Sequence, residues 1–172
     1  DLGITMSLGF TKAAEGLAAL DEPDVGKLLM RAGMLMSQHV PSTMGTLMAS
    51  GLMEGGKALK GKEEIDAAGL ALFVEKFRDA LIMRGKAQPG EKTIVDAFDY
   101  SAKAAAACAG ASLADCARAI EKGALDGLEA TKSMMSVHGK AAVFREKTIG
   151  RPDPGATVGY MFLKAIADFV TG

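Results

Sequence analysis

Apolar residues recur along most of this chain at intervals of three and four positions, with polar residues between them. That spacing places apolar side chains on one face of an α-helix. Glycines, prolines and short acidic segments interrupt the pattern and mark the ends of the helices. The pattern predicts seven helices, at about 3–17, 25–37, 43–61, 66–83, 93–110, 112–136 and 154–169.

Polar residues mark two of the helix starts. Thr93 is followed three positions later by Asp96, which matches a capping box with Asp in place of the usual Glu or Gln. Ser112 and Asp115 repeat that arrangement at the next helix. Gly85 is a typical stop for the fourth helix, because glycine adopts the left-handed conformation that ends helices.

The composition favours helices over sheets. The chain is rich in Ala and has 11 Met, no Trp and only 5% aromatic residues, so it lacks many of the residues that suit a pleated strand. Ala and Gly let helix backbones approach closely, and most predicted connections are short. We therefore expect an all-α fold over residues 1–172, a single domain in which sequence neighbours pack antiparallel in a bundle or closed helical barrel.

The last predicted helix also carries its larger apolar residues on one side. They are Val158, Phe162, Ile166 and Phe169.

Charge and hydropathy exclude several classes of protein. The net charge is −1, without the basic excess typical of nucleic-acid binding. No apolar run approaches the roughly 20 residues that cross a bilayer. Cys108 and Cys116 cannot form a four-ligand zinc site, and we expect both to be packing residues. We expect a cytoplasmic protein that binds neither nucleic acid nor membranes.

Three parts of the sequence depart from what a plain bundle requires. Residues 1–5 and 41–45 combine small or acidic residues with a helix start, where backbone amides can receive phosphate. Taken singly, each segment is more simply explained as a helix cap or a turn. The third part combines 85–93, 139–140 and 149–156, whose glycines allow close backbone approach and whose lysines can neutralise phosphate.

These parts converge if the helices alternate in direction. The first, third, fifth and seventh helices then begin at the same end of the bundle, which brings together their starts at Gly3, Thr43, Thr93 and Pro154. Four positive helix ends beside Asp1 favour a magnesium nucleotide. The residues alone support a phosphate site and no more.

At these segments the chain resembles the L subunit of dihydroxyacetone kinase, the nucleotide-binding DhaL or Dak2-type domain. The resemblance spans the chain in the family's order and spacing. The matching segments are Asp1-Leu2-Gly3-Ile4-Thr5-Met6 with Gly9-Phe10, Arg84-Gly85-Lys86-Ala87-Gln88-Pro89-Gly90-Glu91-Lys92-Thr93, Gly139-Lys140-Ala141-Ala142 with Glu146-Lys147 and Gly150, and Asp153-Pro154-Gly155-Ala156.

The resemblance implies an antiparallel eight-helix barrel that binds ADP or ATP and two magnesium ions at one end. Asp1 matches the last of three metal-binding aspartates, so the family's first helix and other two aspartates are expected upstream. The implied nucleotide contacts are Leu2, Gly3, Ile4, Thr5, Thr43, Met44, Gly85, Thr93, Ile94, Lys140, Asp153, Pro154 and Gly155.

Some of these positions depart from the family pattern. Leu2 replaces a frequent His and Thr5 a frequent Asn, while 41–45 replaces a loop rich in Gly and Ser. Lys140 stands where Arg is common, and the two differ because only Arg contacts phosphate through a bidentate fork. His138 precedes Gly139-Lys140, and the sequence favours neither a place beside the nucleotide nor one away from it. His39 is expected in a solvent-exposed loop.

The implied activity is phosphoryl transfer to a small ketose held on a separate K subunit. That reaction requires positioning and charge neutralisation more than a nucleophile, so no catalytic residue is assigned to this chain. The phosphoryl donor is either ATP or a phosphotransferase-system partner protein that recharges ADP. The alternatives are a kinase subunit for another small sugar, such as a tetrulose, and a non-catalytic protein that senses nucleotides.

Overall fold

The computed structural model describes residues 2–108 and 110–172. Within these ranges the chain forms seven α-helices, two 3₁₀ segments and no strand, which confirms the all-α prediction. The α-helices are α1 (Leu2–Leu17), α2 (Val25–His39), α3 (Thr43–Ala58), α4 (Ala67–Gly85), α5 (Ile94–Ala106), α6 (Leu113–Ala130) and α7 (Pro154–Thr171). The 3₁₀ segments are η1 (Thr131–Ser133) and η2 (Lys140–Thr148).

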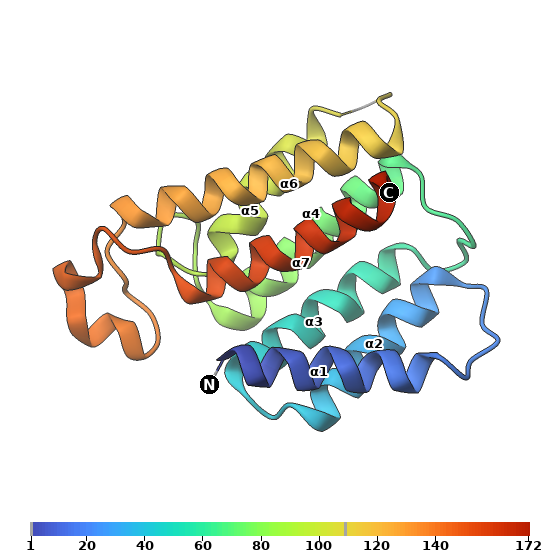
Figure 1. Ribbon diagram of the computed structural model, residues 1–172, viewed down its shortest axis with the longest axis horizontal. Helices are drawn as coiled ribbons and strands as arrows, with labels where there is room; N and C mark the ends of the chain where they lie inside the picture. The colour runs from blue at the N-terminus through green and yellow to red at the C-terminus, as the bar shows by residue number, and fades with distance from the viewer. Residues whose placement is uncertain (1, 109) are drawn as a thin grey trace.

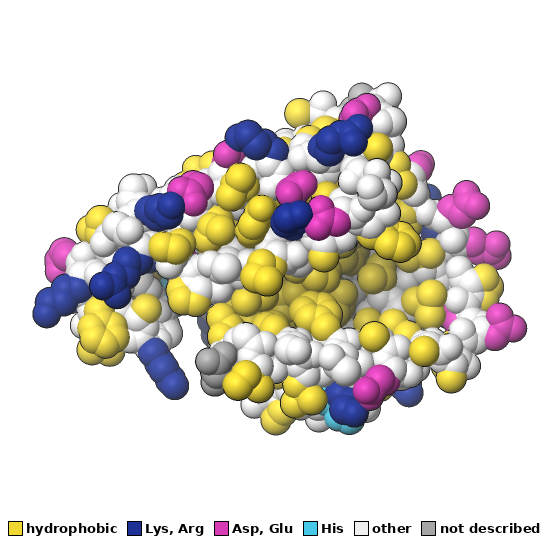
Figure 2. All heavy atoms as spheres, in the orientation of Figure 1, with side chains coloured by type: hydrophobic (Ala, Val, Ile, Leu, Met, Phe, Trp, Pro, Cys, Tyr) yellow, Lys and Arg dark blue, Asp and Glu magenta, His cyan; other side chains and the backbone are white. Residues whose placement is uncertain are grey.

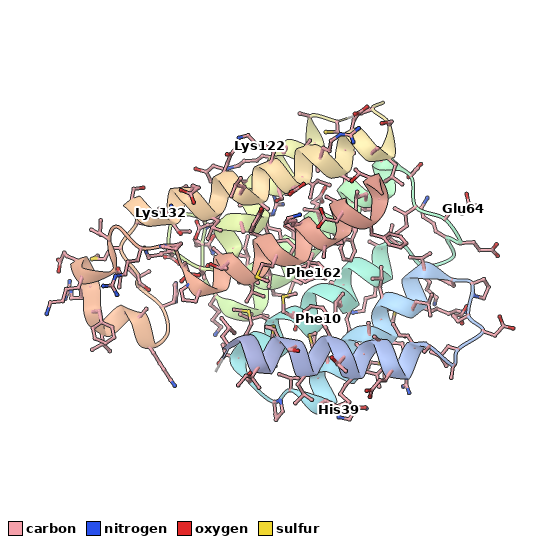
Figure 3. All side chains as sticks on the ribbon, in the orientation of Figure 1. Phe10, His39, Glu64, Lys122, Lys132 and Phe162 are labelled. Atoms are coloured by element: carbon pink, nitrogen blue, oxygen red, sulfur yellow. The ribbon has the colours of Figure 1, made fainter. Side chains whose placement is uncertain are left out.

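Helices adjacent in sequence pack against each other, and α7 returns to lie on both α5 and α6. Figure 1 shows α1, α2 and α3 on one side of the molecule and α4 to α7 on the other. The first and last helices border a hollow lined with hydrophobic side chains (Figure 2). Across it, the rings of Phe10 from α1 and Phe162 from α7 stack with centroids 5.8 Å apart (Figure 3).

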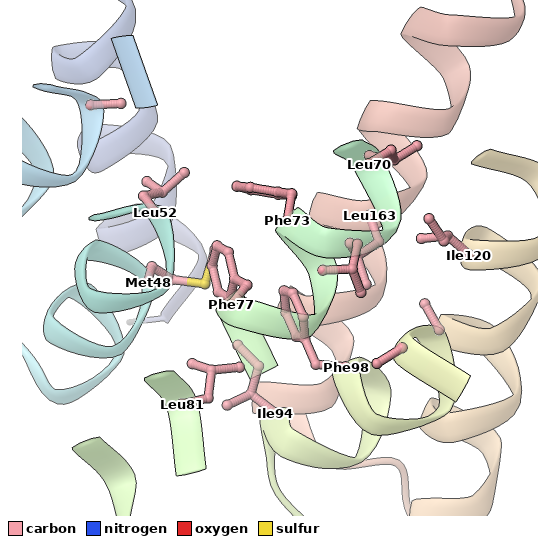
Figure 4. Close-up of a cluster of buried hydrophobic side chains, with 14 of the residues drawn as sticks. Met48, Leu52, Leu70, Phe73, Phe77, Leu81, Ile94, Phe98, Ile120 and Leu163 are labelled. Carbon is pink, nitrogen blue, oxygen red and sulfur yellow. The ribbon is translucent and has the colours of Figure 1, made fainter. Parts of the chain in front are cut away.

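Aromatic rings form the centre of the core. Phe77 of α4 stacks on Phe98 of α5 at 4.4 Å, and Phe73 meets Phe77 edge to face at 5.7 Å. Figure 4 shows these rings among aliphatic side chains from α3, α4, α5, α6 and α7. A Cβ atom on Gly51 would lie 2.1 Å from the Phe77 ring, so glycine is needed for α3 to approach α4 this closely.

The last helix packs against the core both through small residues and through its larger apolar side chains. Its buried residues are small or aliphatic: Gly155, Ala156, Gly159, Leu163 and Ala167. Among the larger apolar residues predicted to share one side, Phe169 is 90% exposed. The rest of that side, including Phe162, is only partly buried. The small residues let α7 approach α5 closely, since a Cβ on Gly159 would lie 3.1 Å from the Cβ of Ala97.

Three helices end earlier than the pattern predicts, α3 at Ala58 instead of near Gly61 and two others by a wider margin. The expected end of the fifth helix near Gly110 is wrong: α5 ends at Ala106, and Gly110 has a φ of +83° that ends helical geometry. The sixth helix was expected to reach Ser136, but α6 ends at Ala130. There the Thr131 hydroxyl donates to the Leu128 carbonyl at 2.6 Å, a local bond that competes with a further helical turn.

The connection between α6 and α7 is the longest in the molecule within the described ranges. We expected a loop over 137–154, but it contains η2, which projects away from the bundle (Figure 1). We call residues 131–153 the excursion. No helix of the described residues is both long and apolar enough to cross a membrane.

Candidate functional site

The starts of alternate helices line one pocket of about 510 Å³. This volume is in the range of small-molecule sites. The pocket takes residues from the beginnings of α1, α3, α5 and α7, the end of α4 and the excursion. Ten of the predicted nucleotide contacts line it: Leu2, Thr43, Met44, Gly85, Thr93, Ile94, Lys140, Asp153, Pro154 and Gly155.

Three further predicted contacts do not line this pocket. Gly3, Ile4 and Thr5 belong to the first turn of α1, beyond Leu2. The side chain of Ile4 is 72% exposed. Asp1, the predicted metal ligand, lies outside the described residues. The helical rotation of α1 therefore directs Leu2, rather than the following residues, to the pocket.

Three of the converging helix starts carry side-chain caps. The Ser42 side chain accepts a hydrogen bond from the Gly45 amide at 3.0 Å, and the Thr93 side chain accepts one from the Val95 amide at 3.1 Å. The Asp153 side chain accepts one from the Ala156 amide at 2.7 Å. Each cap fixes the direction of its helix start. Because the positive ends of these helices meet at one pocket, their partial charges favour an anionic ligand there.

The turn before α5 is held by a buried carboxylate. Asp96, 1% exposed, accepts the amide of Gly90 at 2.6 Å with Oδ1 and that of Thr93 at 2.7 Å with Oδ2. The predicted capping box is thus confirmed. The bond to Gly90 was not predicted. It depends on a turn in which Gly90 has a φ of +93° and Lys92 a φ of +60°.

Lys92 has a different role from the one expected for lysines in this segment. Its side chain is 4% exposed, and its ammonium donates to the carbonyls of Thr131, Thr148 and Arg151 at 2.6, 2.9 and 2.7 Å. An ammonium has three N–H donors, so these bonds occupy all of them. Burial lowers the pKa of Lys92, and the nearby carboxylate of Asp153 opposes that shift. The side chain holds protein backbone and is not available to phosphate.

The start of α7 places a carboxylate and a glycine at the pocket. Burial raises the pKa of Asp153, while the amides of Ala156 and Gly155 and the charge of Lys92 act against it. A Cβ on Gly155 would lie 3.2 Å from Met44 Cε and 3.3 Å from the Ile94 amide nitrogen. Glycine at this position therefore lets three helix starts meet.

The excursion contributes His138, Gly139 and Lys140 to the pocket. Lys140 is exposed, and Gly139, with a φ of +63°, turns the chain just before it. His138 Nε2 lies 2.6 Å from Glu91 Oε2. The pKa of Glu91 is lowered by the Gln88 amide and then by His138. Lys140 is thus the pocket cation that stays accessible to a ligand. His39 does not line the pocket and is an exposed residue of α2 (Figure 3).

The described carboxylates, imidazoles and thiols form no metal-binding cluster. Over 2–108 and 110–172, no group of three or more His, Cys, Asp or Glu side chains is placed to hold a metal ion. Asp96 and Asp153 both use carboxylate oxygens on backbone amides. The described pocket can bind an anion through the helix ends, through Lys140 and through backbone that lies close to the ligand.

The comparisons with known proteins agree with this geometry. The family model described as the DAK2 domain matches residues 1–168. The ADP-binding subunit DhaL of the PEP-dependent dihydroxyacetone kinase of Escherichia coli is 27% identical, over 97% of this chain and 80% of that protein. The L-erythrulose 1-kinase of Mycolicibacterium smegmatis is 30% identical over 99% of this chain, which spans only 30% of that protein.

A solved structure supports the fold. The dihydroxyacetone kinase of C. freundii, in its native form, superposes with a TM-score of 0.65. The superposition covers 98% of this chain and 29% of that one, at 22% sequence identity. Since the family model covers nearly the whole sequence, the chain belongs to the DAK2 domain family.

Proposed function

We propose that this chain is the nucleotide-binding part of a dihydroxyacetone-type kinase and binds ADP or ATP in the pocket described above. In this proposal residues 1–172 act as one domain, and phosphoryl passes to a small ketose held on a separate K subunit. The observation that carries the proposal is the convergence of four helix starts and Lys140 on one pocket. The E. coli relative is named as an ADP-binding subunit, which supports the choice of ligand.

The residues of the pocket have distinct roles in this proposal. The amides at the starts of α3 and α5 attract the phosphates, and the Lys140 ammonium neutralises their charge. Gly139 and Gly155 keep space for backbone approach. Met44 and Leu47 supply apolar surface for the less polar part of the nucleotide. Bound in this way, the nucleotide supplies the phosphoryl group.

Two magnesium ions, with Asp1 as one ligand, are part of the proposal by resemblance to the family. The described residues provide no carboxylate cluster of their own, so we assign no step to the metal. The partners proposed are the K subunit and a phosphotransferase-system donor protein. The donor finds support in the name of the E. coli relative, which is PEP-dependent.

The acceptor has one specific alternative. Relatives include the L-erythrulose 1-kinase of M. smegmatis at 30% identity and the D-erythrulose kinase of the same organism at 31%. A tetrulose is therefore the second candidate substrate. Because the ketose is held on the K subunit in this proposal, the acceptor is tested with K subunits of different specificity.

Binding of MgADP, measured by titration calorimetry, tests the first part of the proposal. Lys140→Met removes the accessible cation and is expected to weaken binding by about tenfold or more, since charge-assisted hydrogen bonds contribute about 1.5–3 kcal/mol. Lys147→Met is the matched control, because Lys147 is an exposed lysine of the same excursion that does not line this pocket. Equal binding by both variants, or none by the unaltered protein, would contradict the proposed site.

Turnover tests the second part. The full chain is mixed with a K subunit, magnesium ATP and either dihydroxyacetone or erythrulose, and the phosphorylated ketose is measured. We expect product only when both subunits are present. Nucleotide binding without turnover would favour the alternative of a nucleotide-sensing protein.

A further inference from the structure

The excursion has little apolar packing of its own. No residue of η2 is buried, and two of its hydrophobic side chains, Val143 and Phe144, are exposed. Yet the excursion carries Lys140 into the pocket near its beginning and Asp153 at its end. Something other than hydrophobic burial must hold these two residues in place, because burial contributes little in this segment.

Hydrogen bonds at the base of the excursion perform that task. The Gly150 amide donates to the Lys132 carbonyl at 2.7 Å, and the Ser136 amide donates to Thr148 Oγ1 at 3.0 Å. These bonds join the outgoing and returning strands of chain to each other. They do not attach the excursion to the helices of the bundle.

Lys92 attaches both ends of the excursion to the turn before α5, and the contact of His138 with Glu91 adds one more attachment to the same turn. The three acceptors of Lys92 lie on the outgoing side, at Thr131, and on the returning side, at Thr148 and Arg151. They are 39, 56 and 59 positions away from it in sequence. One ammonium therefore ties both ends of the excursion to the turn before α5. Thr131 extends the link, because its hydroxyl accepts the Asp153 amide at 3.0 Å.

The turn that presents Lys92 is itself fixed. Lys92 has the left-handed backbone conformation, with a φ of +60°, which is uncommon for residues other than glycine. Asp96 holds the turn on both sides of Lys92, through the amides of Gly90 and Thr93. The same turn leads into the cap of α5, so the ammonium and that wall of the pocket have a common support.

We propose that Lys92 is a positioning residue of the nucleotide site, which sets the places of Lys140 and Asp153 by tying both ends of the excursion to the start of α5. The inference rests on the proposed function for its ligand. It adds a residue that does not itself contact the nucleotide. The positions of its acceptors, rather than its charge alone, give it this role.

The test compares Lys92→Met with the unaltered full chain. Methionine keeps similar length and volume but donates no hydrogen bond. We expect amide hydrogen exchange to speed up in 131–153 while α4 and the Phe77 core keep their protection. We expect the Kd for MgADP to rise about tenfold, because charge-assisted bonds are lost at the base of the site. Lys147→Met is again the control and should change neither measurement.

Two further variants separate positioning from a general structural effect. Lys92→Arg keeps a cationic donor and should restore part of the affinity. If Lys92 acts by placing Lys140, the Lys92→Met substitution should weaken MgADP binding much less in a protein that already carries Lys140→Met than in the unaltered protein. Fully additive effects of the two substitutions would overturn the inference.

The remaining outcomes are also decisive. Unchanged exchange in 131–153 for Lys92→Met would overturn the inference, even if MgADP binds. If that variant does not fold, Lys92→Gln, which keeps two N–H donors, replaces it. Loss of protection throughout the bundle in Lys92→Gln would likewise overturn the inference. If the unaltered protein does not bind MgADP, the proposed function fails, while the exchange measurement still decides whether Lys92 holds the excursion.

Discussion

The aromatic core and the pocket end of this molecule are held together by different forces. In the core, Phe73, Phe77 and Phe98 fill the space between helices, and glycines such as Gly51 make room for them. At the pocket end, buried charged groups hold backbone amides and carbonyls. The core depends on volume and the pocket end on hydrogen-bond geometry, so the two regions should respond to different substitutions.

The difference follows from what each region does. Close packing stabilises a bundle but leaves no space for a ligand. A pocket needs open space, so its walls are held by hydrogen bonds from behind, as Asp96 and Lys92 do here. Loss of such a bond should change ligand binding more than it changes the whole fold.

The largest effect on stability is expected for Phe77→Ala. The ring is completely buried and stacked on Phe98, so its removal should lower the free energy of unfolding by about 3–5 kcal/mol. Urea denaturation followed by circular dichroism measures this loss. Phe169→Ala is the control, since that ring is 90% exposed. Similar losses in both variants would contradict the distinction between core and surface.

Asp96→Ala should have the largest effect at the pocket end. It removes the bonds to Gly90 and Thr93, and loss of such a cap costs about 1–2 kcal/mol. Affinity for MgADP should fall as well, because the turn carries Lys92. Asp115→Ala is the matched control, since Asp115 occupies the corresponding position in α6 but is exposed and far from the pocket. A greater loss in that control would reverse our interpretation.

A smaller, pH-dependent effect is expected for Asp153→Asn. Burial raises the pKa of Asp153 above its ordinary value of 3.8, so the folded protein holds this proton more tightly than the unfolded chain does. The carboxyl's contribution to stability is therefore full below that value and is lost as the pH rises through the higher folded pKa. Asparagine caps a helix about as well as aspartate.

Unfolding by urea between pH 3 and pH 8 checks this expectation. The free energy of unfolding of the unaltered protein, minus that of Asp153→Asn, should fall as the pH rises above 3.8 and then level off. If this difference instead increased with pH, the pKa of Asp153 would be lowered on folding, because the backbone amides and Lys92 would affect it more than burial does.

The last prediction changes no residue and concerns the thiols, whose reactivity measures how well the core excludes solvent. Burial raises the pKa of Cys116 from 9.0 to about 11, with a further contribution from Cys108. At neutral pH the thiolate fraction of Cys116 is therefore about a hundredfold lower in the folded protein than in the unfolded chain. Alkylation of the folded protein should be slower by that factor than alkylation of the protein unfolded in urea. Mass spectrometry after timed labelling distinguishes it from Cys108, which is only partly buried. Equally fast labelling of both would mean that the core opens readily.

The sequence predicted the local features of the fold well. The helices and the caps at Thr93 and Ser112 depend on residues within about four positions of each other, so the pattern contains the information. The alternation of helices brought four of their starts to one pocket, as expected. Binding of a nucleotide there stays a prediction.

Only the tertiary structure decided the role of Lys92, the face of α7 that packs and the course of the excursion. Lys92 meets carbonyls 39 to 59 positions away, and no local pattern specifies such a contact. On α7, the small residues pack against α5 and α6, the Phe162 ring reaches the aromatic core, and Phe169 is left exposed. The sequence by itself determined which segments are helical and where they begin, because those choices depend on neighbouring residues. The pocket's shape was decided by contacts between distant ones.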